Sequence, residues 1–149
     1  GPVLEAGVEV TGRVLATLYA ATTAPDTDFT AKLVDIHPNG YARILTEGIV
    51  RGRYRNSFAK EEFITPGEVL EYTIDLWSVS HVFQKGHRIQ LEISSSNFPK
   101  YDRNPNTGHK FAEDSELRKA TQTIYHNNRY PSHAVLPVVP PKCRLSSGG

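Results

Sequence analysis

The 149-residue chain has little cysteine, little net charge and no long apolar run. Its single cysteine, Cys143, excludes an internal disulfide framework and a zinc site built from cysteines. Lys and Arg number 17 against 16 Asp and Glu, so the net charge of +1 gives no bulk electrostatic reason to expect nucleic acid or an anionic membrane as a partner. The apolar runs fall far short of the about 20 residues of a membrane helix, and the N-terminus lacks a basic-then-apolar signal pattern. We therefore expect no membrane or nucleic-acid partner and favour a cytoplasmic location.

The length is close to the commonest size of one domain, which could bury roughly 70% of the surface that the unfolded chain exposes. The two ends differ from the interior. Gly1 and Pro2 resemble a protease-cleavage scar, and LSSGG at 145–149 resembles a linker. We predict a single domain over residues 3–141 with a tail at 142–149, excised from a longer protein.

Apolar and polar residues alternate with a period of two along most of the chain, as in strands with one buried face. The clearest cases are VLEYTIDLW at 69–77 and HRIQLEISS at 87–95. Turn signals such as HPNG at 37–40 separate the strands. Further predicted strands cover 8–19, 29–37, 41–55, 120–125 and 134–139, and only 78–84 and 112–120 are read as short helices. The pattern predicts an all-β fold, an antiparallel β-sandwich of the jelly-roll class that resembles galactose-binding domains in shape, with one or two short helices.

Two groups of charged residues are placed to interact with each other. They are Asp26, Asp28 and Asp35 on one side and Arg51, Arg53 and Arg55 on the other. The arginines alternate along a predicted strand, so their guanidinium groups would line one face and could bind the carboxylates. Carboxylate oxygens also suit calcium, but three acids without a further ligand cluster favour ion pairing. We predict structural ion pairs, no metal site and no cofactor.

The stretch SSSNFPKYDRNPNTG at 94–108 combines serines, asparagines, prolines and aromatic residues directly after a strand pattern. A serine nucleophile needs a base within hydrogen-bonding reach and usually a sharp turn such as G-x-S-x-G, which is absent. Asparagine amides and prolines fit an ordered loop. Because exposed Phe98 and Tyr101 would be costly to leave in water, we favour a loop that docks against a partner surface over an isolated loop.

Histidine and tryptophan provide weaker signals. The six histidines lie singly, without an H-x-x-x-H or H-x-H spacing, so zinc chemistry is not expected. Trp77 closes an alternating strand and is expected to pack in the core or at an edge. No run of exposed aromatic residues accompanies the arginines for stacking on nucleic-acid bases.

Several motifs in order resemble the C-terminal jelly roll of the cocaine esterase and X-Pro dipeptidyl-peptidase family of serine hydrolases (CocE/NonD). They are VEVTGRVLATLY, PDTDFTAKLVDIHPNG, EGIVRGRYR, PGEVLEYTIDLW, HVFQKGHRIQLEISSSNFPKYDRNPNTG, TIYH and PSHAVLPV, spanning about residues 8–139. In that family an N-terminal α/β-hydrolase domain with a helical cap carries the Ser-Asp-His triad. The resemblance implies that the catalytic residues lie outside this chain and that the fragment alone is inactive.

The resemblance also implies a role and partners. The domain would brace the hydrolase and cap domains of an esterase, acylase or X-Pro dipeptidyl-peptidase and wall part of the substrate cleft. The residues expected to face the missing domain are Asn97, Phe98, Tyr101, Asp102, Arg103 and Asn104. Sequence that commonly precedes VEVTG in the family would supply a further strand, so an open edge could permit a homodimer or domain exchange.

Two alternatives from other functional classes stay open at this stage. One is a free-standing carbohydrate-binding jelly roll with Trp77 or Tyr101 as a platform and calcium at Asp26 and Asp28. The other is an enzyme complete in itself, which would have to use Ser94, Ser95 or Ser96.

Overall fold

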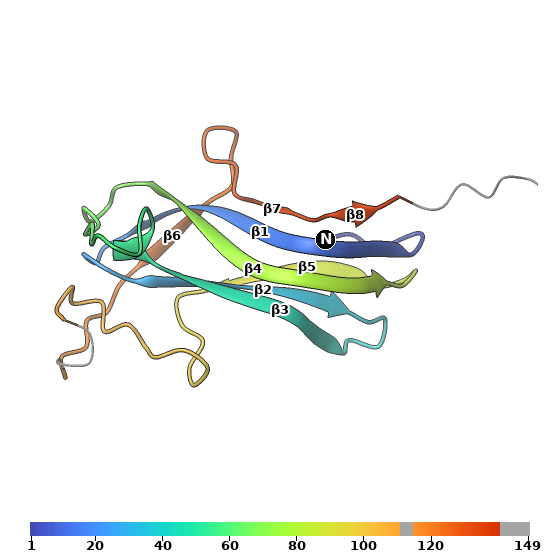
Figure 1. The fold of residues 1–149 in the computed structure, drawn as a ribbon, viewed down its shortest axis with the longest axis horizontal. Coiled ribbons are helices and arrows are strands. Elements are labelled where there is room, and N and C mark those ends of the chain that lie inside the picture. Colours follow the sequence, from blue (N-terminus) through green and yellow to red (C-terminus); the bar gives the residue numbers. More distant parts are fainter. Residues whose placement is uncertain (111–114, 141–149) are drawn as a thin grey trace, which may run out of the picture.

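The computed structural model describes residues 1–110 and 115–140 as a sandwich of two antiparallel sheets (Figure 1). The strands are β1 (Val8–Thr22), β2 (Asp28–Ile36), β3 (Ala42–Arg51), β4 (Leu70–Phe83), β5 (Arg88–Ser94), β6 (Gln122–Tyr125), β7 (His133–Val135) and β8 (Val138–Val139), with one 3-10 turn, η1 (Gly52–Tyr54). The predicted all-β sandwich is confirmed. No helix of the described residues is long and apolar enough to cross a membrane.

One sheet has the order β3-β2-β5, and the other is built around β1. β1 pairs with β4 on one side and with β6, β7 and β8 in succession on the other. The chain thus passes from one layer to the other after β1, after β3, after β4 and after β5. The long connection from β5 to β6 carries the chain from the first sheet to the second.

The core lies between the two layers, where the alternating apolar faces meet. Most of its buried residues lie on β1, β2 and β4: Val10, Val14, Ala16, Leu18, Phe29, Ala31, Leu33, Tyr72, Ile74, Leu76 and Phe83. The rings of Phe29 and Tyr72 lie 4.8 Å apart, centroid to centroid, and join the two sheets through an aromatic contact. Period-two burial is therefore what fixes the sandwich.

The predicted helix at 78–84 is wrong, because residues 78–83 continue β4. Ser78 pairs with Arg13 and Asp75 with Leu15, so two residues of β4 oppose one residue of β1 in a β-bulge. Trp77 lies in this bulge with φ of 65°. The extra residue moves the buried face from even positions, such as Ile74, to odd ones, such as Phe83, and this phase change hid the strand from a period-two pattern.

Two other predicted elements differ from the structure. The strand predicted over 41–55 ends at Arg51, where η1 turns the chain inward and Gly52 N–H donates to Thr27 O at 2.8 Å. The predicted helix at 112–120 lies partly outside the described residues, and its described part, 115–120, forms no regular element. Only Arg51 of the three alternating arginines therefore lies in a strand, and the chain turns directly after it.

The sandwich is closed along one side by β3 and β4, which are edge strands of different sheets. Thr46 Oγ1 donates a hydrogen bond to Leu76 O across this seam. Gly48 lies so close to β4 that a Cβ placed there would meet Asp75 O at 2.0 Å. These two edges face each other, so at the seam neither strand exposes a row of unpaired backbone groups to another chain.

Candidate interface around the 95–121 segment

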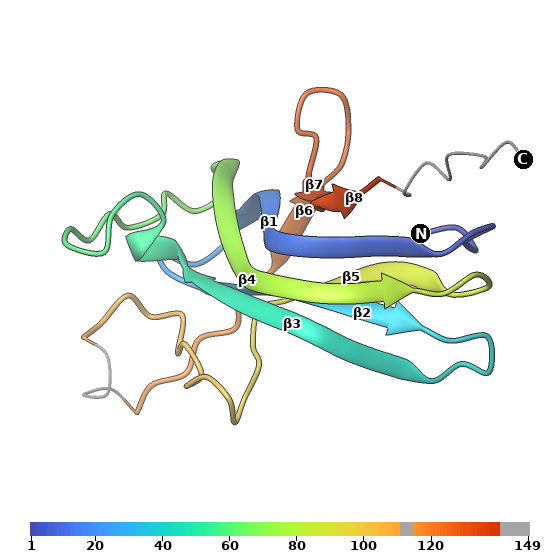
Figure 2. The same cartoon turned by 45° about the vertical axis from the view of Figure 1, so that its right-hand side comes forward.

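The segment from 95 to 121 connects β5 to β6 and lies at the same end of the sandwich as η1 (Figures 1 and 2). Its described parts are 95–110 and 115–121. The hairpins at 37–41 and 84–87 lie at the opposite end. The candidate interface is therefore built by loops of one end of the sandwich.

A buried asparagine fastens this segment to the sheet beneath it. Asn104 is only 6% exposed, and its Nδ2 donates to Asp26 Oδ2 at 2.9 Å and to Asp28 Oδ1 at 2.8 Å. Its Oδ1 accepts a hydrogen bond from Asn106 N–H at 2.9 Å and so orders the next turn. Asn104 therefore faces inward and supports the loop.

Arg53 forms the second half of the same buried network. Its Nε donates to Asp26 Oδ2 at 2.8 Å, and its backbone N–H donates to Asp26 Oδ1 at 2.9 Å. Its Nη2 reaches His109 O at 3.0 Å. Both Asp26 and Arg53 are buried, so the network joins β2, η1 and the connecting segment where water does not compete.

The other charged residues of the predicted set divide between different partners. Arg51 binds Asp28 in a bidentate pair, with Nε to Oδ1 at 2.9 Å and Nη2 to Oδ2 at 3.0 Å. Arg55 donates to Glu62 O at 2.6 Å. Because η1 interrupts the strand, the three guanidinium groups do not line one face of a strand. The carboxylates of Asp26 and Asp28 accept hydrogen bonds from arginine and asparagine, an arrangement that does not suit calcium.

A hollow of about 520 Å³ opens beside this network. Its wall combines charged, aromatic and apolar side chains from both sheets, η1 and the connecting segment: Asp28, Ile49, Val50, Arg51, Tyr54, Arg55, Asn56, Ser57, Phe58, Thr73, Asp75, Tyr101 and Asp102. Two of the phenylalanines at this end are largely open to solvent: Phe58 is 96% exposed and Phe98 is 67% exposed. Exposed rings beside a hollow of mixed and largely apolar lining are typical of a surface that another protein surface covers.

The structure places the six residues predicted to face a partner in two groups. Phe98, Asp102 and Arg103 are exposed, and Tyr101 is half-buried against the hollow. Asn97 and Asn104 bind the sheet, with Asn97 Nδ2 donating to Glu47 Oε2. The first group is free to contact a partner, whereas the second holds the loop in place.

Glu47 on β3 is a pH-sensitive anchor of this loop. The hydrogen bond from Lys100 holds the pKa of Glu47 below its ordinary value; partial burial opposes the shift and the bond from Asn97 adds to it. A depressed folded-state pKa means that the stabilisation is complete above about pH 4.3, the unfolded value, and is lost as pH falls through the folded pKa. In thermal melts from pH 7 to pH 3, Glu47→Gln should lower the melting temperature at pH 7, with the deficit shrinking below pH 4.

Lys100→Ala provides the matched control, because it removes the main cause of the shift and leaves the carboxylate in place. It should flatten the same part of the pH profile. If the melting temperature of Glu47→Gln depends on pH between pH 3 and pH 5 in the same way as that of the wild type, the assignment is contradicted.

The serines of the segment show no catalytic arrangement. Ser94 Oγ accepts a hydrogen bond from Ser96 N–H at 3.3 Å, and Ser94 O accepts one from Thr30 Oγ1 at 3.3 Å. Within residues 1–110 and 115–140, none of Ser94, Ser95 and Ser96 bonds to a histidine. Nothing in this geometry activates a serine as a nucleophile.

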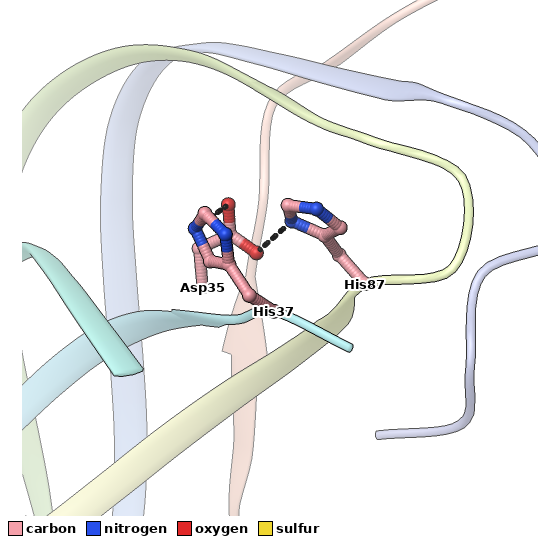
Figure 3. Close-up of side chains that lie close together, drawn as sticks. All are labelled: Asp35, His37 and His87. Atoms are coloured by element: carbon pink, nitrogen blue, oxygen red, sulfur yellow. Dashed lines mark hydrogen bonds and ion pairs between the residues drawn. The ribbon is translucent and has the colours of Figure 1, made fainter. Parts of the chain in front are cut away.

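Asp35, the third predicted acid, lies at the other end of the sandwich and binds histidines (Figure 3). Its Oδ1 lies 2.8 Å from His87 Nδ1, and its Oδ2 lies 2.9 Å from His81 Nε2. Burial alone would raise the pKa of Asp35, but the bonds from His81 and His87 outweigh it and hold the pKa below its ordinary value.

Sequence reasoning missed these histidines because it searched for close spacings. His37 lies two residues after Asp35 and is therefore on the same face of an extended chain. His81 and His87 flank the turn between β4 and β5, which brings distant positions together. A search for histidines on both sides of predicted hairpins would have found this cluster.

Trp77 is exposed, contrary to the expectation of core or edge packing. The β-bulge turns its side chain away from the buried face that Leu76 occupies. Its backbone N–H donates to Asp75 Oδ1 at 2.9 Å, which holds the bulge.

Most of the chain matches a known domain family and resembles part of a longer esterase. Residues 2–135 match the family model described as the X-Pro dipeptidyl-peptidase C-terminal non-catalytic domain. The chain is 50% identical over 139 residues to the cocaine esterase of Rhodococcus sp. (strain MB1 Bresler), covering 92% of this chain and 24% of that protein.

Two solved structures share the architecture closely. One is an aminopeptidase from a marine sediment archaeon, Thaumarchaeota archaeon, with a TM-score of 0.88 and 38% identity over 93% of this chain and 25% of that one. The other is an α-amino acid ester hydrolase, with a TM-score of 0.87 and 35% identity over 93% of this chain and 24% of that one. The chain thus spans about a quarter of the length of these similar proteins.

Proposed function

Because the chain belongs to the family of X-Pro dipeptidyl-peptidase C-terminal non-catalytic domains, we propose that it braces the catalytic and cap domains of a serine hydrolase that cleaves ester, amide or X-Pro peptide bonds. The hydrolase would transfer an acyl group to water through an acyl-serine intermediate formed on its own catalytic residues. This domain contributes rigid surface and no reacting group.

The main support for the proposal is that exposed aromatic rings lie on loops held in place by a buried hydrogen-bonded network. Phe58 and Phe98 project at one end of the sandwich, while Asp26, Arg53 and Asn104 hold the underlying loops. A preorganised surface loses less conformational entropy on docking than a mobile one does. The hollow beside Tyr101 and Asp102 is the part of this surface proposed to wall the substrate cleft.

A chimera tests this function directly. The matching quarter of the Rhodococcus cocaine esterase is replaced by this chain, and hydrolysis of a p-nitrophenyl acyl ester is measured. We expect no turnover by the isolated chain and turnover by the chimera. Phe58→Ala with Phe98→Ala should shorten the half-life of chimera activity at elevated temperature, because the two rings would no longer be buried against the hydrolase.

Tyr41→Ala is the matched control, since this ring is 59% exposed in the hairpin at the opposite end. It should leave the half-life of the chimera unchanged. Equal half-lives for the double variant and the parent chimera would exclude this surface as the interface. Serine-dependent turnover by the isolated chain would overturn the accessory role itself.

A further inference from the structure

Three side chains from the hairpin end of the sandwich converge on one point (Figure 3). Asp35 comes from β2, His37 from the hairpin after it, and His87 from the turn before β5. One ligand atom of each lies within 4.8 Å of the other two. This cluster lies at the opposite end from the proposed interface, so it requires a separate explanation.

One atom of the cluster is unexplained by internal hydrogen bonding. His37 Nε2 is buried and has no hydrogen-bond partner among the described residues. It lies 3.8 Å from Asp35 Oδ2, beyond hydrogen-bonding distance. A buried, unpaired polar atom is costly unless something binds it. Its position beside a buried carboxylate suggests that a cation supplies the missing partner.

We propose that Asp35, His37 and His87 bind a divalent transition-metal ion, with zinc as the best match. Two imidazole nitrogens and one carboxylate oxygen are ligands that zinc prefers, whereas calcium prefers oxygen ligands alone. Ligands of a tetrahedral zinc ion at about 2.0–2.2 Å lie roughly 3.3–3.6 Å from one another. The observed separations, from 2.8 Å between Asp35 and His87 to at most 4.8 Å, bracket this spacing.

Binding replaces the hydrogen bond between His87 and Asp35 with two metal bonds. The His87 imidazole then presents Nδ1 as a lone pair and carries its proton on Nε2. The side chain of His37 is 32% exposed, so an ion can reach the cluster from solvent. The fourth coordination position is left to water.

His81 acts as a positioning residue for this site. Its Nε2 lies 2.9 Å from Asp35 Oδ2 and comes from β4 of the other sheet. Such a bond to a ligating carboxylate fixes its orientation, and its loss typically weakens metal binding about 10–100-fold. The site would therefore connect both sheets of the sandwich.

Zinc binding to the 149-residue chain provides the test, by equilibrium dialysis with metal analysis and by thermal melting with Zn²⁺ or Ca²⁺. We expect one Zn²⁺ per chain, a melting temperature raised by Zn²⁺, and no shift with Ca²⁺. Co²⁺ at the same site should give the visible absorption of a low-symmetry, nitrogen-ligated ion. His81→Ala should weaken zinc binding about 10–100-fold.

His37→Phe is the decisive variant. It keeps an aromatic ring against Tyr41 and His87, whose ring centroids lie 5.1 and 4.3 Å from that of His37, but removes the ligand nitrogen. The variant should retain the wild-type circular dichroism spectrum and lose the zinc-induced shift. His126→Ala, at an exposed histidine elsewhere, should bind zinc as the wild type does. No stoichiometric zinc in the wild type, or equal binding by His37→Phe, would overturn the proposal; neither result bears on the accessory role.

Discussion

Replacing Asp26 with alanine should lower the free energy of unfolding by about 3–5 kcal/mol, which is typical for breaking a buried ion pair from one side. Asp26 is fully buried and accepts hydrogen bonds from Arg53 Nε, Arg53 N–H and Asn104 Nδ2. Its removal leaves a buried guanidinium group without its carboxylate and an amide with one acceptor fewer. Urea unfolding followed by circular dichroism gives the change directly.

Arg13→Ala is the control for this prediction, because Arg13 forms an ion pair with Asp75 at 2.6 Å at the surface. Surface ion pairs contribute little, so its unfolding midpoint should stay close to that of the wild type. If Asp26→Ala unfolds within about 1 kcal/mol of the wild type, the network does not support the loops in the way described.

The second large effect is expected from Gly48→Val at the seam between β3 and β4. A Cβ at this position would meet Asp75 O at 2.0 Å and Asp75 C at 2.8 Å, and both are backbone atoms that cannot rotate away. The two edge strands would have to separate. We expect a loss of about 3 kcal/mol or more, at the upper end of the range for overpacking, measured by the same denaturation.

Gly40→Ala separates steric overlap from backbone strain. Gly40 has φ of 86° in the hairpin after β2, and no atom lies within 4 Å of a Cβ placed there. Alanine at this position should cost only about 1–2 kcal/mol, from the left-handed conformation alone. A smaller loss for Gly48→Val than for Gly40→Ala would show that the seam yields easily.

The β-sandwich could be predicted from the sequence because its core depends on period-two burial, and this alternation of apolar and polar residues is visible in a single sequence. Leu70 to Leu76 and Ile89 to Ile93 alternate without interruption, and both became strands. The same pattern failed after Trp77 because the bulge shifts the buried face by one residue. It also failed after Arg51, where the conformation of η1 depends on contacts with Asp26 and Thr27, which directly precede β2. A local pattern cannot contain contacts made by distant residues.

The candidate site was predictable to a lesser extent. The composition of 94–108 indicated an ordered loop, and exposed Phe98 agrees with a surface that can dock. The inward role of Asn104 could not be read from the sequence, because an asparagine in a turn and one that bridges two buried carboxylates look the same. The grouping of Asp35 with three histidines required the pairing of β2 with β5 and the packing of β4 against them. Charge and spacing in the sequence identified many of the residues that form these networks, but not all of the residues that each one binds.

The position of β1 in its sheet has a consequence for how the chain folds. β4 fills one edge of β1, but the other edge is filled by β6, β7 and β8, and Glu9 pairs with Val139. At about 5–20 residues per second, a ribosome needs on the order of ten seconds between making β1 and making β8. Closing such long loops is slow, so this sheet should be completed late, after most of the chain has been synthesised. During that interval β1 keeps an unpaired edge, so the nascent chain is expected to be prone to aggregation until β6, β7 and β8 have been made.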